Sequence, residues 1–200
     1  MIKNIIFDFG DIFINLDKPA TAREMGKFGF ETLTPDLEFL FQRYEKGMIS
    51  SEKFISAANQ IFPSATPAEL LYAWNAIILD FPEYRLEFIE DLVSQYTYRV
   101  FLLSNTNALH IEKVRQNMGR DRYERFKKCF ERFYLSHEIQ LRKPDADSYR
   151  FVLDENQLIA QETLFVDDTL ENTDAAQQLG IKTWHLQVGV EDIVNLKSKL

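Results

Sequence analysis

The chain has 200 residues, of which 46% are hydrophobic, enough for one sizeable core. Its 31 acidic and 23 basic residues give a formal net charge of −8, which argues against nucleic-acid or anionic-membrane binding, since both depend on basic side chains. No apolar run approaches the ~20 residues that span a bilayer, and no signal-peptide pattern opens the sequence. With a single cysteine, these features favour a cytoplasmic protein.

Five short apolar runs predict the strands of a sheet. They suit parallel strands covered by helices on both sides, because each is mostly apolar on both faces. The runs are 5–7, 99–103, 133–135, 163–166 and 182–186. Segments with helical spacing lie between them at 107–118, 145–155 and 170–180. This alternation predicts an α/β fold, a doubly wound, Rossmann-like parallel sheet.

Residues 17–82 interrupt the alternation. Four helix-like stretches, 20–29, 35–46, 51–61 and 67–79, follow one another, separated by proline and serine residues. We expect a small helical-bundle cap here, inserted into a core domain formed by residues 1–16 and 83–200. Open α/β sheets bind ligands at the carboxyl ends of their strands, so the cap could cover such a site.

Asp8 follows the first predicted strand directly. A carboxylate there can attack phosphorus if a divalent cation screens the repulsion between the two anions. Gly10 permits a sharp turn, so that its carbonyl can also face the ion. Taken alone, Asp8 could equally be a turn residue or a helix cap.

Three further polar groups follow later strands. Ser104 and Asn105 could hold a phosphate oxygen through a hydroxyl and a backbone N–H, or could cap a helix. Lys143, extended before a proline, could neutralise a phosphoryl group or be an ordinary surface lysine. The adjacent acids Asp167 and Asp168 suit Mg²⁺, or the N-terminus of a helix. Each group follows a different parallel strand, so all should meet at one edge of the sheet.

This order of motifs resembles the haloacid dehalogenase-like (HAD) hydrolase superfamily. It is most similar to the bacterial subgroup that includes α-D-glucose-1-phosphate phosphatase. The resemblance covers essentially the whole chain. The matching segments are 7–10, 103–107 with His110 nearby, 134–136, 142–144 and 165–168 leading to Asn172.

The resemblance implies a magnesium-dependent phosphatase acting on a small phosphorylated metabolite, with a sugar 1-phosphate favoured. It implies an aspartyl-phosphate intermediate on Asp8. Ser104, Asn105 and Lys143 would hold the phosphoryl oxygens. The implied metal ligands are Asp8, the Gly10 carbonyl and Asp168 directly, and Asp167 through a metal-bound water.

Gly10 departs from the pattern of most phosphatases of the superfamily, which have a second aspartate there as general acid and base. Asp11, His110, a cap residue or the substrate could supply the proton instead. The departure leaves open a catalytically weak binding or regulatory protein. A metal-independent 2-haloacid dehalogenase is a further alternative, although adjacent acids beside the nucleophile would hinder it.

Substrate specificity should come from the cap. Polar or aromatic candidates there are Tyr44, Glu45, Lys46 and Trp74, which are equally interpretable as helix surface and cap core.

Overall fold

A five-stranded parallel sheet forms the centre of the protein, as seen in a computed structural model that describes residues 1–96 and 98–200. The strand order is β3-β2-β1-β4-β5. Central β1 places Ile6 between Phe101 of β2 and Phe165 of β4. The strands are β1 (Asn4–Phe7), β2 (Arg99–Ser104), β3 (Arg132–Leu135), β4 (Thr163–Asp167) and β5 (Lys182–His185). All five predicted strands and the doubly wound fold are confirmed.

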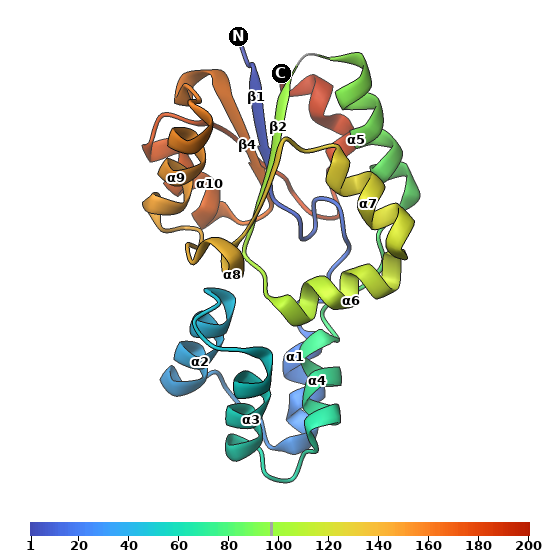
Figure 1. The fold of residues 1–200 in the computed structure, drawn as a ribbon, viewed down its shortest axis with the longest axis vertical. Coiled ribbons are helices and arrows are strands. Elements are labelled where there is room, and N and C mark those ends of the chain that lie inside the picture. Colours follow the sequence, from blue (N-terminus) through green and yellow to red (C-terminus); the bar gives the residue numbers. More distant parts are fainter. Residues whose placement is uncertain (97) are drawn as a thin grey trace.

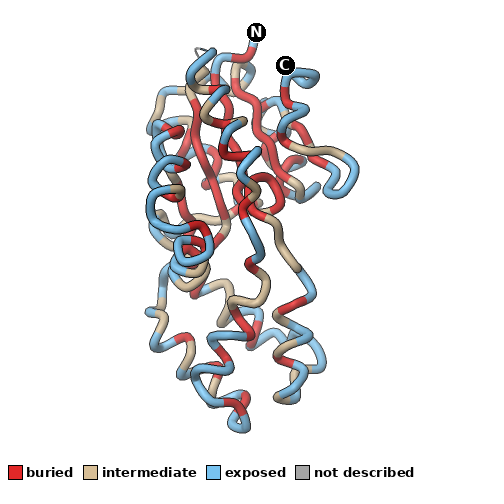
Figure 2. The backbone as a smooth tube through the Cα atoms, turned by 90° about the vertical axis from the view of Figure 1, so that its right-hand side faces the viewer, coloured by how far each residue is buried: buried red, intermediate tan, exposed pale blue. Residues whose placement is uncertain are grey.

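Helices cover both faces of the sheet (Figure 1). Ile5 and Phe7 pack into one hydrophobic cluster and Ile6 into another, because successive strand side chains point to opposite faces. The first face is covered by α5 (Glu83–Gln95), α7 (Arg120–Lys128) and η3 (Ile193–Ser198), and the second by α9 (Ala146–Asn156) and α10 (Leu170–Gln178). The core also contains α6 (Ala108–Met118), α8 (Ser136–Ile139) and η2 (Ala160–Glu162). The central strands β1, β2 and β4 are accordingly almost entirely buried, whereas the edge strands β3 and β5 are partly exposed (Figure 2).

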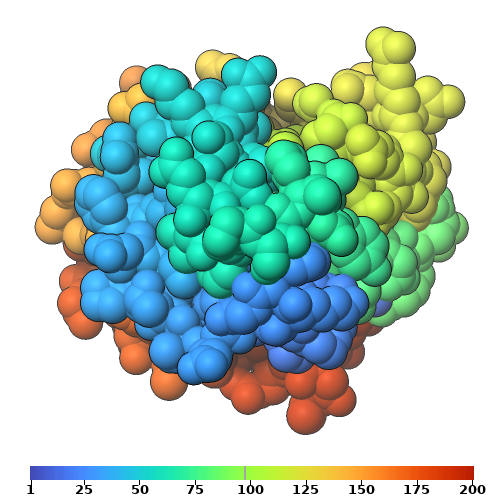
Figure 3. Space-filling view, turned by 90° about the horizontal axis from the view of Figure 1, so that it is seen from below, coloured from blue at the N-terminus to red at the C-terminus, as the bar shows by residue number. Residues whose placement is uncertain are grey.

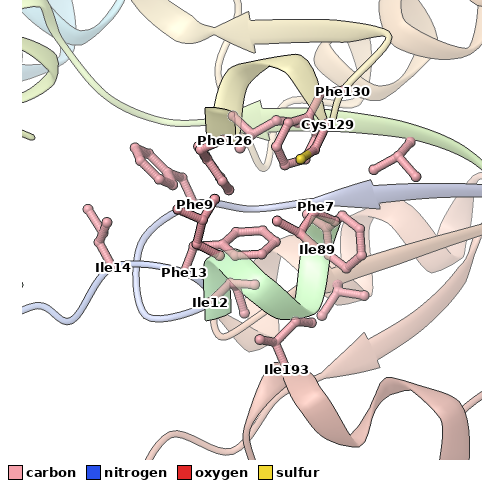
Figure 4. Close-up of a cluster of buried hydrophobic side chains, with 14 of the residues drawn as sticks. Phe7, Phe9, Ile12, Phe13, Ile14, Ile89, Phe126, Cys129, Phe130 and Ile193 are labelled. Atoms are coloured by element: carbon pink, nitrogen blue, oxygen red, sulfur yellow. The ribbon is translucent and has the colours of Figure 1, made fainter. Parts of the chain in front are cut away.

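A cluster of phenylalanine rings fixes the loop that follows β1 (Figure 4). The fully buried ring of Phe126 in α7 lies 5.2 Å from that of Phe9 and 4.9 Å from that of Phe13, measured between centroids. Phe81 and Phe130 complete the packing around Phe126, at 5.0 and 4.9 Å. Edge-to-face and stacked ring pairs add to the energy of burial. The loop carrying Asp8 is therefore anchored on a rigid aromatic core.

Residues 20–75 form a separate helical lobe with its own hydrophobic clusters. The helices are α1 (Ala20–Met25), η1 (Gly26–Phe28), α2 (Pro35–Glu45), α3 (Ser51–Ile61) and α4 (Pro67–Asn75). Thr34, Ser50 and Thr66 cap three of them, each side chain accepting a hydrogen bond from an amide in the first turn. The four predicted helical stretches thus correspond to this lobe.

Two adjacent segments connect the lobe to the core. Asn15 N donates to Asp80 O at 2.9 Å, and Asp17 N donates to Ile77 O at 2.9 Å. The chain therefore leaves and re-enters the core at one place, and the lobe lies below the carboxyl ends of the strands (Figure 1). Viewed from below, the lobe covers the centre of the molecule (Figure 3). The domain boundaries at residues 17 and 82 stay a prediction.

No helix within residues 1–96 and 98–200 has the length and apolar character needed to cross a membrane.

Replacing Phe126 with alanine should lower the free energy of unfolding by about 3–5 kcal/mol, because the cavity left at the centre of the aromatic cluster cannot collapse fully. Urea denaturation followed by circular dichroism measures the change. Phe39, whose side chain is 63% exposed, provides the matched control, and Phe39→Ala should change stability by only about 0.5 kcal/mol. Equal losses of stability in the two variants would show that the cluster around Phe126 does not anchor the loop after β1.

Candidate active site

The Lys143 ammonium group lies between two carboxylates at the ends of neighbouring strands. Its Nζ donates at 2.6 Å to Asp8 Oδ1, just beyond β1, and at 2.6 Å to Asp167 Oδ2, at the end of β4. The Lys143 side chain is only 1% exposed. Burial lowers the pKa of this ammonium, but the two carboxylates more than compensate, and the pKa is raised overall. Lys143 is therefore charged.

Asn105 holds the backbone of Lys143 in place. Lys143 N donates to Asn105 Oδ1 at 2.8 Å, and Asn105 Nδ2 donates to Lys143 O at 2.7 Å. This side-chain pairing joins the loop after β2 to the segment before α9. Sequence reasoning expected Asn105 to act through its backbone N–H and did not anticipate this positioning contact.

The Asp167 carboxylate is already occupied by hydrogen bonds. Besides Lys143, it accepts from Thr169 N at 2.8 Å and from Asn172 Nδ2, which is 3.1 Å from each oxygen. Asp8, by contrast, has one oxygen paired with Lys143. Burial raises the pKa of Asp8 to about 7, against the opposing effect of Lys143.

Asp168 completes a group of three carboxylates. One oxygen each from Asp8, Asp167 and Asp168 lies within 4.8 Å of the others. Lys143 balances one of these charges, which leaves −2, equal and opposite to the charge of one divalent cation. Oxygen ligands with this charge suit Mg²⁺. The residues present therefore fit a magnesium ion.

Lys18 reaches this group from the link to the helical lobe. Its Nζ pairs with Asp168 Oδ2 and with Asp11 Oδ2, the latter at 3.1 Å. Burial lowers the pKa of Lys18, but both carboxylates raise it, and the net shift is upward. Since Lys18 and Asp11 cancel in charge, the balance of −2 around the carboxylates is unchanged.

A cavity of about 790 Å³ opens beside these groups, between core and lobe. Sites for small molecules typically have this size. The lobe contributes Leu33, Glu38, Phe41, Gln42, Glu45 and Lys46 to its wall. The core contributes, among others, Asp8, Gly10, Asn105, Lys143 and Asp168.

Most of the sequence-predicted site residues therefore meet in space. Ser104 differs, because it is buried at the end of β2 and is not among the residues lining the cavity. Asp167 lies behind Lys143 and also does not line the cavity. The catalytic and metal-binding roles of all these residues stay predictions.

Gly10 leaves room for Leu16. A Cβ added at Gly10 would lie 2.7 Å from Leu16 Cδ1, so an aspartate there would have to displace this side chain. Asp11 does not take over the position, because its Oδ1 accepts from Leu16 N at 3.0 Å and its other oxygen pairs with Lys18. Asp11 orders the loop and does not line the cavity.

His110 joins the lobe to the core. Its ring stacks on Trp74 with centroids 5.1 Å apart, and its Nε2 is 3.0 Å from Trp74 O. The carbonyl can only accept, so Nε2 carries the proton, and Nδ1 accepts from Asn107 Nδ2 at 3.1 Å. Burial lowers the pKa of His110 to about 4. A neutral ring with both nitrogens engaged is suited to packing and not to protonating a leaving group.

The four candidate specificity residues separate into two pairs. Tyr44 and Trp74 belong to the aromatic core of the lobe, where Tyr44 stacks on Phe54 at 4.2 Å. Glu45 and Lys46 line the cavity. Sequence reasoning missed Glu38 and Gln42, although residues 38, 42 and 45 share one helical face, a pattern that could have indicated them.

Comparisons with known proteins place the chain in a family. Residues 2–180 match the profile of the haloacid dehalogenase-like hydrolases. The chain is 27% identical over 197 residues to a D-ribitol-5-phosphate phosphatase of Bacteroides thetaiotaomicron, covering 96% of this chain and 95% of the relative. The chain therefore belongs to the haloacid dehalogenase-like hydrolase family.

Solved structures of other proteins share the fold of this chain. A mutant of the HAD family enzyme BT-2542 from Bacteroides thetaiotaomicron, in complex with magnesium and inorganic phosphate, superposes with a TM-score of 0.86 at 32% identity. The match covers 98% of this chain and 99% of that one. An L-2-haloacid dehalogenase from Xanthobacter autotrophicus shares the fold, with a TM-score of 0.60 at 18% identity over 93% of this chain and 78% of that one.

The His110 ring should stay neutral down to about pH 5, because burial depresses its pKa. In the unfolded chain the same ring has an ordinary pKa near 6.5, so the unfolded state takes up the proton first as the pH falls. The stability due to His110 is therefore complete above pH 6.5. This stability is lost as the pH falls from 6.5 toward 4. Between these two pKa values the loss approaches about 1.4 kcal/mol per pH unit.

NMR titration of the imidazole resonances measures this pKa, and His110→Gln assigns the signal. The difference in stability between the wild type and this variant should shrink from pH 7 to pH 4. A His110 resonance that titrates near pH 6.5 would contradict the neutral ring packed on Trp74.

Proposed function

We propose that this hydrolase is a magnesium-dependent phosphatase that removes phosphate from a small sugar or sugar-alcohol phosphate. The class of enzyme is that of the phosphoric monoester hydrolases, with Mg²⁺ as cofactor. The proposal rests above all on the three clustered carboxylates with a buried ammonium among them, at the mouth of a metabolite-sized cavity. The relative that acts on D-ribitol 5-phosphate supports a substrate of this kind.

Asp8, Asp168 and the Gly10 carbonyl would hold the magnesium ion directly. Asp167 would act through a metal-bound water, since its oxygens already accept hydrogen bonds from Lys143, Thr169 and Asn172. When bound, the ion screens the repulsion between Asp8 and the phosphate and offsets charge on the phosphoryl oxygens.

Asp8 supplies the nucleophile. One carboxylate oxygen attacks phosphorus, the bond from phosphorus to the substrate oxygen breaks, and an aspartyl-phosphate forms. Water then attacks phosphorus, releasing inorganic phosphate and restoring the Asp8 carboxylate. Lys143 would neutralise charge throughout, and the Asn105 N–H would bind a phosphoryl oxygen from the cavity wall. The Ser104 hydroxyl, predicted for the same role, lies buried at the end of β2 outside the cavity lining.

The proton for the leaving alcohol comes from water in the open cavity. Leu16 fills the space beside Gly10, where most phosphatases of the superfamily have an acid, and the His110 ring is neutral with both nitrogens engaged. Without a positioned acid, catalysis by this chain should be slower, by about 10²-fold or more, than catalysis with one.

The alternative chemistries fit less well. A metal-independent dehalogenase would have to keep Asp8 reactive beside Asp167 and Asp168 with no cation to offset their charge beyond the lysines. A non-catalytic binding protein would not need a nucleophile facing a cavity. The likeness to a haloacid dehalogenase at 18% identity extends to the fold alone.

Asp8→Asn should abolish hydrolysis of p-nitrophenyl phosphate in the presence of Mg²⁺, by roughly 10⁴-fold or more, because the amide cannot replace the nucleophile. EDTA should abolish the activity of the wild type. Asp147→Asn, an isosteric change at an exposed side chain outside the cavity, should leave turnover unchanged.

Circular dichroism verifies that the variants are folded. Turnover of a 2-haloacid in EDTA would favour the dehalogenase. A wild-type protein inactive toward a broad panel of phosphate monoesters would refute the phosphatase.

A further inference from the structure

The basic side chains around the outer part of the cavity are all engaged with carboxylates. Lys46 Nζ lies 3.2 Å from Asp145 Oδ2, and Arg142 Nη2 lies 3.2 Å from Glu45 Oε2. Lys18 is held by Asp11 and Asp168. None of these cations is therefore free to receive a second anionic group of a substrate.

Two acidic side chains in the same wall have no such partner. Glu38 comes from α2 in the lobe and Glu171 from α10 in the core, and both are exposed where they line the cavity. Across residues 1–96 and 98–200, neither forms an ion pair, and Glu38 Oε1 only accepts from Gln42 Nε2 at 3.2 Å. The two carboxylates thus offer free hydrogen-bond acceptors.

The formal charge of the cavity lining also disfavours a second anionic group on the substrate. Six acidic and four basic side chains line the cavity, for a formal charge of −2. A divalent cation cancels this charge, and a bound phosphate dianion restores it. A second negative group on the substrate would meet repulsion, whereas a hydroxyl group could donate to Glu38, Glu171 or Gln42.

We propose that the cavity selects neutral, hydroxyl-rich monophosphates and rejects phosphates that carry a second anionic group, with Glu38 and Glu171 as the residues that discriminate. The inference rests on the proposed phosphatase function and narrows its substrate class. Sugar-alcohol and sugar monophosphates belong to the accepted class. Sugar-acid phosphates and bisphosphates belong to the rejected class.

Pairs of substrates that differ only in one charged group test the selectivity. A sugar-alcohol phosphate is compared with the corresponding sugar-acid phosphate, in which a carboxylate replaces the terminal CH₂OH group. The wild type should show a kcat/KM at least about tenfold higher for the sugar-alcohol phosphate, a modest effect for like charges at short range near a protein surface.

The double variant Glu38→Gln/Glu171→Gln keeps the size and the hydrogen-bonding capacity of both side chains. It should reduce the preference for the neutral substrate several-fold, because two of the repelling charges are gone. The matched control is Asp36→Asn/Asp174→Asn, which makes the same change in net charge on the same two helices, outside the cavity. The control should keep the wild-type preference.

The outcomes distinguish a failure of the proposed selectivity from a failure of the proposed phosphatase function. Equal or faster turnover of the sugar-acid phosphate by the wild type, or an unchanged preference in the glutamate double variant, overturns the selectivity and leaves the phosphatase intact. A loss of preference in the control as well assigns the effect to overall charge and also overturns it. Absence of turnover of every phosphate, including p-nitrophenyl phosphate, removes the phosphatase function and the selectivity together.

Discussion

The ammonium group of Lys143, buried between the carboxylates of Asp8 and Asp167, is the interaction on which the site depends. Parallel strands β1 and β4 end side by side, so Asp8, just beyond β1, and Asp167, the last residue of β4, bring like charges together out of water. Burying such charges is costly unless each is paired, and removing one partner of a buried pair typically costs about 3–5 kcal/mol. Lys143 makes the arrangement possible and still leaves a charge of −2 for a cation.

Rigid supports surround this pairing. The aromatic cluster around Phe126 holds the loop after Asp8, and Asn105 fixes the backbone of Lys143 through two hydrogen bonds. The lobe is joined to the same region, since Ser136 Oγ donates to Glu45 O at 2.7 Å beside the Arg142–Glu45 ion pair. The groups for chemistry and the wall that faces the substrate are thus parts of one connected structure.

Much of the fold could be predicted from the sequence, because it is encoded in local patterns. Apolar runs such as 163–166 marked the buried strands, and helical spacing interrupted by proline marked the lobe. Convergence of Asp8, Lys143 and Asp168 followed from one rule, that parallel strands end at the same edge of a sheet. The family motifs strengthened that prediction.

The other features of the site depend on contacts between segments distant in the sequence, which no local sequence pattern predicts. The side-chain role of Asn105 requires the loop 38 residues away that it holds. The stacking of His110 requires Trp74 in the lobe, and the space beside Gly10 is filled by Leu16 from the far end of the same loop. The paired state of Lys46 and Arg142 likewise became visible only once lobe and core were placed against each other.

The shared cation site is tested most directly by the effect of Mg²⁺ on thermal unfolding. A ligand at 100 times its Kd stabilises the native state by about 2.7 kcal/mol, so Mg²⁺ should raise the Tm of the wild type and of Asp147→Asn by several degrees. Asp168→Asn, which removes a charge from the carboxylate group, should lose this shift. An equal rise in the Asp168→Asn variant, or no rise in the wild type, would contradict a magnesium site formed by the three carboxylates.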